Sequence, residues 1–382
     1  MGSELFTMVG LLTMAAAVLS FLFCGLFVWL GPRDAPDEAR KVQARPIPTA
    51  GGTGQFVAVG LLFAGLAVAS HGPLSDLLER LVAWGAIPHL VMIIGLVITG
   101  FIDDAFGMKA WLKLLIIVGL CAGASAFGFH AETLTLPGTE TVIELSPVVG
   151  IAGSALWLIV LINAVNFMDG SNGYAPGMLL IGLAGYAAYF WISLPVFSAP
   201  KLIALLVTMS FIGALAGFLV WNMSNKLYMG DAGALGLGAL FGSLGLFVLK
   251  DVAEHSGPTD PFAGLVWFPA MLALPFLVDV LLTLGWRTIK RERIMSAHRE
   301  HAYQLFLRAG VRPLWVMLSG WLTAATCTLA ATYGIYVLHD PQNAGQTVAN
   351  VGWMFVALVL GLSAVWLLQR VIWGTIVRKK GA

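Results

Sequence analysis

The chain carries at residues 148–173 the stretch VVGIAGSALWLIVLINAVNFMDGSNG, in which an apolar run leads directly into a polar turn. About 20 apolar residues are enough for a helix to cross a bilayer. The turn contains Asp169 among asparagines and glycines, a composition that suits a plain loop. It also suits magnesium and phosphate, because hard oxygen ligands stand beside glycines that permit close approach. The stretch therefore predicts a membrane-spanning helix that ends at a cation-binding loop.

Composition extends this pattern to the whole molecule. The chain has 382 residues, of which 59% are hydrophobic and 11% charged, and its mean hydropathy is +0.87. A soluble domain does not carry so few charges over so much apolar sequence, so the chain is predicted to be a polytopic membrane protein. The net charge of +1 gives no indication of nucleic-acid binding. Its three cysteines lie within apolar runs and predict no disulfide framework.

Apolar runs long enough to span a bilayer recur along the chain and predict an all-α fold of about 11 transmembrane helices. No soluble domain fits between the runs, so residues 1–382 are taken as a single integral membrane domain. The predicted spans are residues 5–30, 52–70, 84–102, 110–129, 148–165, 175–193, 201–222, 232–249, 263–285, 314–338 and 350–373.

The basic residues decide the orientation. With the N-terminus outside, only Arg80, Lys201 and Lys250 of the 21 Lys and Arg lie on the outer side, as the positive-inside rule requires. The N-terminus is thus predicted to be periplasmic and the C-terminus cytoplasmic. Residues 132–145 alternate polar and apolar and predict a small periplasmic hairpin. Outer acids such as Asp251 and Glu254 are expected to be solvated.

The candidate site residues gather on the predicted inner side. Asp103 and Asp104 end the third span, where an acid opposes the helix macrodipole and two adjacent carboxylates repel each other. Such an arrangement indicates that a cation or a proton is handled there. Lys113, shortly after, either extends its amine to the membrane surface or binds phosphate.

Asp231, in Gly230-Asp231-Ala232-Gly233, opens the eighth span. An acid in this position is often an N-cap, and a helix N-terminus is also a site for an anion or a metal phosphate. Asp231 and Asp169 on one face would form a magnesium pair, because magnesium takes one or two carboxylates together with water and substrate phosphates.

A basic loop further along contains His298, Arg299 and His301. Two histidines at this spacing are compatible with zinc, but no third ligand is apparent, so contact with a diphosphate is the favoured interpretation over zinc and over a plain basic face. Asp279 is an acid inside a span and therefore a functional candidate. Arg45 precedes a Pro-Thr-Ala-Gly-Gly segment that could touch a lipid phosphate.

Together these segments resemble the polyprenyl-phosphate N-acetylhexosamine-1-phosphate transferases, which include the MraY, WecA and WbpL types of glycosyltransferase family 4. The resemblance covers nearly the whole chain in order and spacing. It is carried by Pro-Thr-x-Gly-Gly, the Asp-Asp pair, Asn-x-x-Asn-x-x-Asp-Gly, Gly-Asp-x-Gly and a late histidine loop. The family transfers a sugar-1-phosphate from a UDP-sugar to undecaprenyl phosphate with Mg²⁺ and releases UMP at a cytoplasm-facing site.

The resemblance implies a role for each matching position. It makes Asp231 a Mg²⁺ ligand with Asp169 or Asn166 as its partner, and it places Asp103 and Asp104 near the attacking lipid phosphate. It assigns Lys113 to the sugar-nucleotide phosphates. The remaining implied substrate contacts are Asn163, Asn166, Asn172 and Asn222 around the sugar nucleotide, with Asn172 and Asn222 near the uridine, and His298, Arg299 and His301 at the diphosphate or sugar.

The sequence departs from the family pattern at three places, and its segments around Asn172 and His301 look most like the WbpL-like branch. Asn172 stands where a second Asp is usual, Ala234 replaces a serine, and the histidine cluster reads His-Arg-Glu-His-Ala-Tyr-Gln. That branch starts O-antigen-type polysaccharides with 6-deoxy-N-acetylhexosamines. A UDP-GlcNAc-specific, WecA-like transferase is the alternative within the family, and a transporter or flippase is the alternative from another class.

The resemblance also implies a setting. It predicts a multi-pass protein of the bacterial inner membrane whose partners are a UDP-N-acetylhexosamine donor, undecaprenyl phosphate and membrane lipids. Mg²⁺ is the expected cofactor, with Mn²⁺ able to substitute. Nucleic acid is not an expected partner, and a homodimer is left open.

Overall fold

The computed structural model describes residues 2–34, 46–69, 79, 82–139, 141–193, 199–255, 265–292, 299–339 and 348–379. Within these residues it contains 12 helices and almost no sheet. The helices are α1 (Gly2–Leu30), α2 (Gly51–Ala69), α4 (Ile87–Phe106), α5 (Ala110–Phe127), α6 (Pro147–Met168), α7 (Tyr174–Ser193), α8 (Ala199–Met223), α9 (Gly230–His255), α10 (Trp267–Ile289), α11 (Ala302–Arg308), α12 (Pro313–His339) and α13 (Val348–Lys379).

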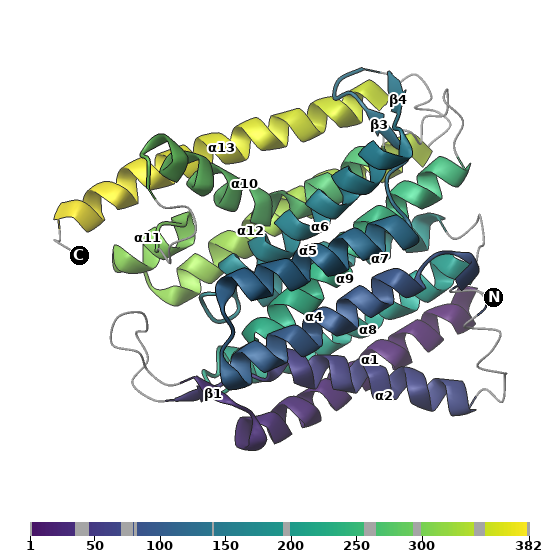
Figure 1. Cartoon of the computed structure of the whole chain (residues 1–382), viewed down its shortest axis with the longest axis horizontal. Helices are drawn as coiled ribbons and strands as arrows, with labels where there is room; N and C mark the ends of the chain where they lie inside the picture. The colour runs from purple at the N-terminus through teal and green to yellow at the C-terminus, as the bar shows by residue number, and fades with distance from the viewer. Residues whose placement is uncertain are drawn as a thin grey trace.

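Eleven of these helices are long and apolar enough to cross a membrane, which confirms the predicted all-α polytopic fold and the number of spans. The long helices run roughly alongside one another, and the two termini lie at opposite ends of the bundle (Figure 1). An odd number of crossings requires this arrangement. Which end faces the cytoplasm stays a prediction.

Two short antiparallel pairs of strands flank the bundle. The predicted hairpin is confirmed as β3 (Thr133–Thr135) paired antiparallel with β4 (Val142–Glu144). It lies at the same end of the bundle as the N-terminus (Figure 1). A second pair, β1 (Arg33–Asp34) with β2 (Ile47–Pro48), lies at the opposite end and leads into α2.

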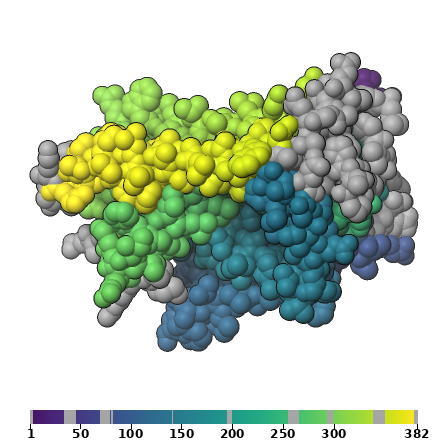
Figure 2. Space-filling model, turned by 90° about the horizontal axis from the view of Figure 1, so that it is seen from above, coloured from purple at the N-terminus to yellow at the C-terminus, as the bar shows by residue number. Residues whose placement is uncertain are grey.

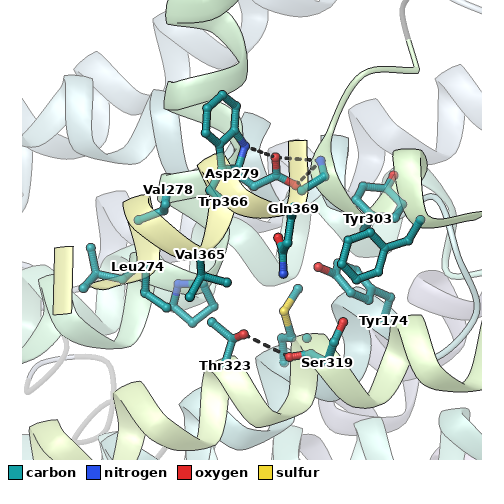
Figure 3. A pocket seen from close by; sticks show the side chains of 16 residues that line it. Tyr174, Leu274, Val278, Asp279, Tyr303, Ser319, Thr323, Val365, Trp366 and Gln369 are labelled. Atoms are coloured by element: carbon teal, nitrogen blue, oxygen red, sulfur yellow. Dashed lines mark hydrogen bonds between the residues drawn. The ribbon is translucent and has the colours of Figure 1, made fainter. Parts of the chain in front are cut away.

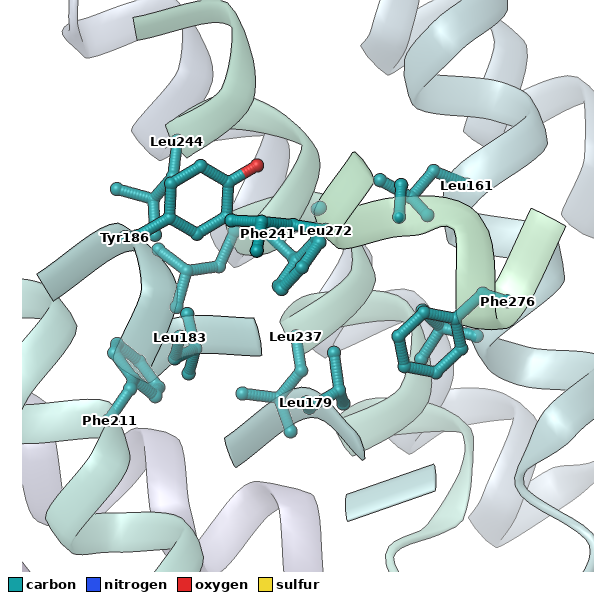
Figure 4. Close-up of a cluster of buried hydrophobic side chains, with 14 of the residues drawn as sticks. Leu161, Leu179, Leu183, Tyr186, Phe211, Leu237, Phe241, Leu244, Leu272 and Phe276 are labelled. Atoms are coloured by element: carbon teal, nitrogen blue, oxygen red, sulfur yellow. The ribbon is translucent and has the colours of Figure 1, made fainter. Parts of the chain in front are cut away.

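Helix α9 is the centre of the bundle. Its membrane-spanning window is 94% buried, and it packs against α2, α4, α6 and α10. Its sequence is rich in glycine and alanine, and small residues allow membrane helices to approach closely. Aromatic and leucine side chains from α6 to α10 fill the interior around it (Figure 4). A central, tightly held α9 fixes the position of Asp231 at its first turn.

Helix α13 lies at the periphery. Only 17% of its spanning window is buried, and it extends along the outside of the bundle beside α10 and α12 (Figures 1 and 2). Exposed apolar residues such as Leu360 and Leu368 cover its outer face. An apolar exposed surface is expected of a helix in contact with lipid.

One expectation about the outer acids is wrong. Asp251 near the end of α9 is buried, with Lys201 Nζ 3.1 Å from its Oδ2 and the Tyr189 hydroxyl donating to that oxygen at 2.7 Å. A buried carboxylate requires a paired charge and hydrogen bonds, and α7 and α8 supply both. Sequence alone did not pair Lys201 with Asp251, because 50 positions separate the two residues on different helices.

Candidate active site

Asp104 joins the ends of two helices. Its carboxylate accepts the backbone N–H of Asp231 at 3.1 Å and that of Ala232 at 3.2 Å. At the end of α4 this charge opposes the macrodipole of its own helix, and at the start of α9 it complements the macrodipole of its neighbour. The Asp104 charge, which is unfavourable at the end of α4, is therefore stabilised by the start of α9. The backbone amides of Asp231 and Ala232 at the start of α9 therefore bind Asp104, and an anion or metal phosphate at this helix N-terminus stays a prediction.

The glycine pair Gly51-Gly52 also builds the start of α9. Gly51 N–H donates to Tyr228 O at 3.0 Å, and Gly52 N–H donates to Met229 O at 2.8 Å. A Cβ on Gly52 would lie 2.0 Å from the Gly233 Cα. These glycines therefore let the backbone of α2 touch the Gly-Asp turn, and contact of this segment with a lipid phosphate stays a prediction.

Replacing Gly52 by alanine should lower the melting temperature and activity together. The added methyl meets backbone that cannot move aside, and overpacking of this kind typically costs about 1–3 kcal/mol. Thermal unfolding in detergent checks the effect. Gly60→Ala on the same helix is the matched control, because a Cβ there meets nothing within 4 Å. Equal melting temperatures for the two variants would contradict the close approach of α2 and α9.

A partly buried ammonium connects two carboxylates at the centre of the site. Lys113 Nζ lies 2.9 Å from Asp103 Oδ2 and also forms an ion pair with Asp231 Oδ2. The Lys113 and Asp103 side chains are each only 16% exposed. Asp103 is held further by the backbone N–H of Met108, which donates to its Oδ1 at 2.6 Å. Three helices, α4, α5 and α9, thus bring together the residues that the sequence grouped on one face.

Helix α6 adds the other side of this cluster. The Asn166 side-chain amide donates to Asp231 Oδ1 at 2.6 Å. Asp169 lies just beyond the end of α6, where burial and the negative charges of Asp231 and Asp104 raise its pKa to about 8. Burial is the largest cause of this shift, and a cation bound beside Asp169 would lower the pKa again by favouring the ionised carboxylate.

The donor set fits magnesium. Asp231 and Asp169 offer two carboxylates, and Asn166 holds Asp231 in place while keeping an amide oxygen of its own. Within the described residues no three His, Cys, Asp or Glu side chains gather into a complete metal cage. Magnesium does not need such a cage, because it is commonly bound by one or two carboxylates with water and substrate phosphates. The set would suit zinc poorly, since the part of this cluster that the structure describes holds no thiolate or histidine.

The residues predicted to lie near the uridine connect the loops that follow α6 and α8. Asn222 is 2% exposed; its Oδ1 accepts Gly173 N–H at 2.6 Å and its Nδ2 donates to Leu227 O at 2.9 Å. Asn172 donates to Asn225 Oδ1 at 2.6 Å. Asn163, deeper in α6, donates to the carbonyl of its own helix at Ile159. These contacts shape the edge of the site, and a direct role at the uridine stays a prediction.

A second polar cluster surrounds Asp279 and His301. The two side chains approach to 3.8 Å between Asp279 Oδ1 and His301 Nδ1, and both are buried. His301 caps α11, with Gln304 accepting its backbone N–H at 3.3 Å. The His301 ring also stacks on Phe167 of the Asp169 loop at a centroid distance of 6.1 Å. The histidine loop thus lies beside the carboxylate cluster, as the sequence predicted.

Three further predicted residues complete the comparison with the sequence. Among the described residues, one buried guanidinium nitrogen of Arg299 has no hydrogen-bond partner, which is the state expected of a group that receives an anion. Arg45 and His298 lie outside the described residues.

A small cavity beside Asp279, about 60 Å³ in volume, is too small for a sugar nucleotide and holds at most a few waters.

Known proteins are similar to this chain in the region that contains Asp103, Asp169 and Asp231. A sequence model of the family "Glycosyl transferase family 4" matches residues 86–249, from α4 to α9. The decaprenyl-phosphate N-acetylglucosaminephosphotransferase of Mycolicibacterium smegmatis is 27% identical over 92% of this chain and 86% of its own length. The phospho-N-acetylmuramoyl-pentapeptide-transferase of Lactobacillus delbrueckii subsp. bulgaricus is 31% identical over 62% of this chain and 74% of its own length.

The match with a probable undecaprenyl-phosphate N-acetylglucosaminyl 1-phosphate transferase of Bacillus subtilis is 26% identical and covers 74% of this chain and 71% of that protein. With the eleven spans and the partly buried carboxylate cluster, these similarities define the chain as a membrane-embedded phosphotransferase. It belongs to glycosyl transferase family 4. The transporter alternative considered from the sequence is not supported.

Proposed function

We propose that the chain transfers an N-acetylhexosamine-1-phosphate from a UDP-sugar to undecaprenyl phosphate, releasing UMP. The observation that carries this proposal is the cluster of Asp231, Lys113, Asp103 and Asn166 beside Asp169, at one end of the bundle. Carboxylates and cations at a membrane surface suit a reaction between a lipid phosphate and a soluble diphosphate. The named substrates of the family members compared above support the same reaction class.

The proposed step is a direct phosphoryl transfer. An oxygen of the lipid phosphate attacks the β-phosphorus of the UDP-sugar, and the bond from that phosphorus to the UMP oxygen breaks. Mg²⁺ held by Asp231 and Asp169 would offset the charge on the diphosphate and on the departing UMP. Lys113 and Arg299 supply fixed positive charge, and positioning with electrostatics provides most of the rate in phosphoryl transfer.

The two adjacent aspartates have different parts in this proposal. Asp104 is engaged with α9 and serves as a positioning residue. Asp103 keeps a contact with Lys113 and orients that ammonium. A phosphate monoester has a second pKa near 6, so the lipid phosphate needs little help from a base at neutral pH. The alternative two-step route through an aspartyl-phosphate predicts a covalent adduct when the lipid is withheld, which intact-mass measurement would detect.

The sugar is proposed from the branch of the family. The segments around Asn172 and His301 favour a 6-deoxy-N-acetylhexosamine and a role at the start of O-antigen or another cell-envelope polysaccharide. UDP-GlcNAc is the second candidate donor, because the relatives from Mycolicibacterium smegmatis and Bacillus subtilis are named for N-acetylglucosamine. The proposed location is the bacterial inner membrane, with the site facing the cytoplasm.

UMP release by the purified protein tests the function. The reaction contains undecaprenyl phosphate, Mg²⁺ and one of a panel of UDP-sugars, with EDTA or Mn²⁺ in parallel samples. We expect UMP only when lipid and divalent cation are both present, and one donor to exceed the others. A folded protein that releases no UMP from any donor would contradict the proposal.

A further inference from the structure

The carboxylate of Asp279 accepts hydrogen bonds from three helices, α10, α11 and α13. Both of its oxygens accept the backbone N–H of Ala302, at 2.9 and 3.0 Å. Its Oδ1 also accepts the indole N–H of Trp366 at 3.0 Å (Figure 3) and the hydroxyl of Thr283 at 3.1 Å. Asp279 in α10 therefore caps α11 from outside that helix, and α13 supports the cap.

Arg370 makes a second connection one turn further along α13. Its guanidinium donates to the Glu300 backbone carbonyl at 2.8 Å and pairs with Glu300 Oε2 at 3.1 Å. Arg287 of α10 approaches the other carboxylate oxygen of Glu300 at 3.0 Å. The residue between Arg299 and His301 is thus held by two arginines from different spans.

Helix α11 in turn contacts the Asp169 loop. The Tyr303 hydroxyl donates to Phe167 O at 2.9 Å, and the Tyr303 ring stacks on Tyr174 at 4.8 Å. A Cβ on Gly170 would lie 2.2 Å from the Tyr303 hydroxyl oxygen. Tyr303 fits so closely against the Asp169 loop that a displacement of α11 must either move this loop or break the contacts of Tyr303.

We propose that Trp366 and Arg370 are positioning residues, which act through Asp279 and Glu300 to hold Arg299 and His301 at the sugar-diphosphate. This inference rests on the proposed function. The family sequence match ends at residue 249, so the supporting contacts lie in a part of the chain that the match does not cover. Helix α13, though mostly exposed to lipid, would therefore carry two side chains that the reaction requires.

Two variants with matched controls test the proposal. Trp366→Phe keeps the ring and removes the donor, and Arg370→Gln removes the charge. We expect each to lower kcat/KM for the UDP-sugar by about tenfold to a hundredfold, the range that small displacements of reacting groups produce. Trp353→Phe and Arg378→Gln on the same helix should leave it unchanged, because Trp353 touches the outer hairpin and Arg378 bonds within its own helix.

A double-mutant cycle separates positioning from general destabilisation. If Arg370 acts through Glu300, adding Arg370→Gln to Glu300→Gln should cost little more than either change alone, because interacting residues give non-additive effects. Full additivity, or equal losses in the control variants, would overturn the proposal.

Hydrogen exchange of residues 299–309 gives an answer that does not depend on activity. Trp366→Phe should accelerate exchange in this segment, including the Ala302 amide, while Trp353→Phe should not. Unchanged exchange would overturn the connection itself. If the wild-type protein shows the protection but no transfer with any donor, the proposed function fails while the connection stands.

Discussion

Replacing Asp231 by asparagine should reduce transfer about a thousandfold or more while the protein still folds. The variant removes a charge that contacts Lys113 and Asn166 and that would hold the cation on the diphosphate. Losses of a hundredfold to a thousandfold follow the removal of a single stabilising donor from an active site, and a ligand to a catalytic ion should matter at least as much. Initial rates of UMP release provide the measurement.

The control for this variant lies on the same helix. Glu254→Gln changes an acid at the far end of α9, where its partner is Lys250 rather than the site. It should keep the wild-type rate and the wild-type elution profile. Substantial transfer by the Asp231→Asn variant would contradict the assignment of Asp231 as a ligand of the cation.

Replacing Lys113 by glutamine should strongly reduce transfer and at the same time tighten the binding of a divalent cation. The Lys113 ammonium bridges Asp103 and Asp231 and so competes for the carboxylate that a cation requires. Removing it leaves two close carboxylates whose repulsion a cation relieves. We expect transfer to fall by at least about a hundredfold, through loss of positive charge at the transferring phosphate.

Titration with Mn²⁺, followed by the electron paramagnetic resonance signal of the free ion, measures the affinity without substrate. Lys109→Gln is the matched control, because Lys109 is an exposed lysine just before the same helix. Weaker Mn²⁺ binding by Lys113→Gln than by Lys109→Gln would contradict the competition between ammonium and cation.

The spans and the grouping of the site could be predicted from the sequence for simple reasons. Hydropathy alone marks a helix that must satisfy its backbone in lipid, and the eleven spans follow from it. Once the spans are counted, Asp103, Asp169 and Asp231 must lie at one end of the bundle. The motifs then direct attention to the residues that the structure brings into contact.

The partners within the site could not be predicted, because they depend on which helices are neighbours. Asp104 reaches the N-terminus of α9 across 127 positions of sequence, and Trp366 reaches Asp279 across 87. The need for glycine at position 52 likewise becomes apparent only when the structure places Gly233 beside it. A hydrophobic pattern places a helix in the membrane but leaves open which face meets which neighbour.

The central claim is that the sugar leaves the donor together with a phosphate. A donor labelled with ³²P at its β-phosphate tests it most directly, with undecaprenyl phosphate, Mg²⁺ and the purified protein. We expect the label to move into the organic phase as lipid diphosphate sugar while the uridine product is unlabelled UMP. Label that stays in the aqueous phase as UDP, with sugar on the lipid, would show transfer of the sugar alone and contradict the account.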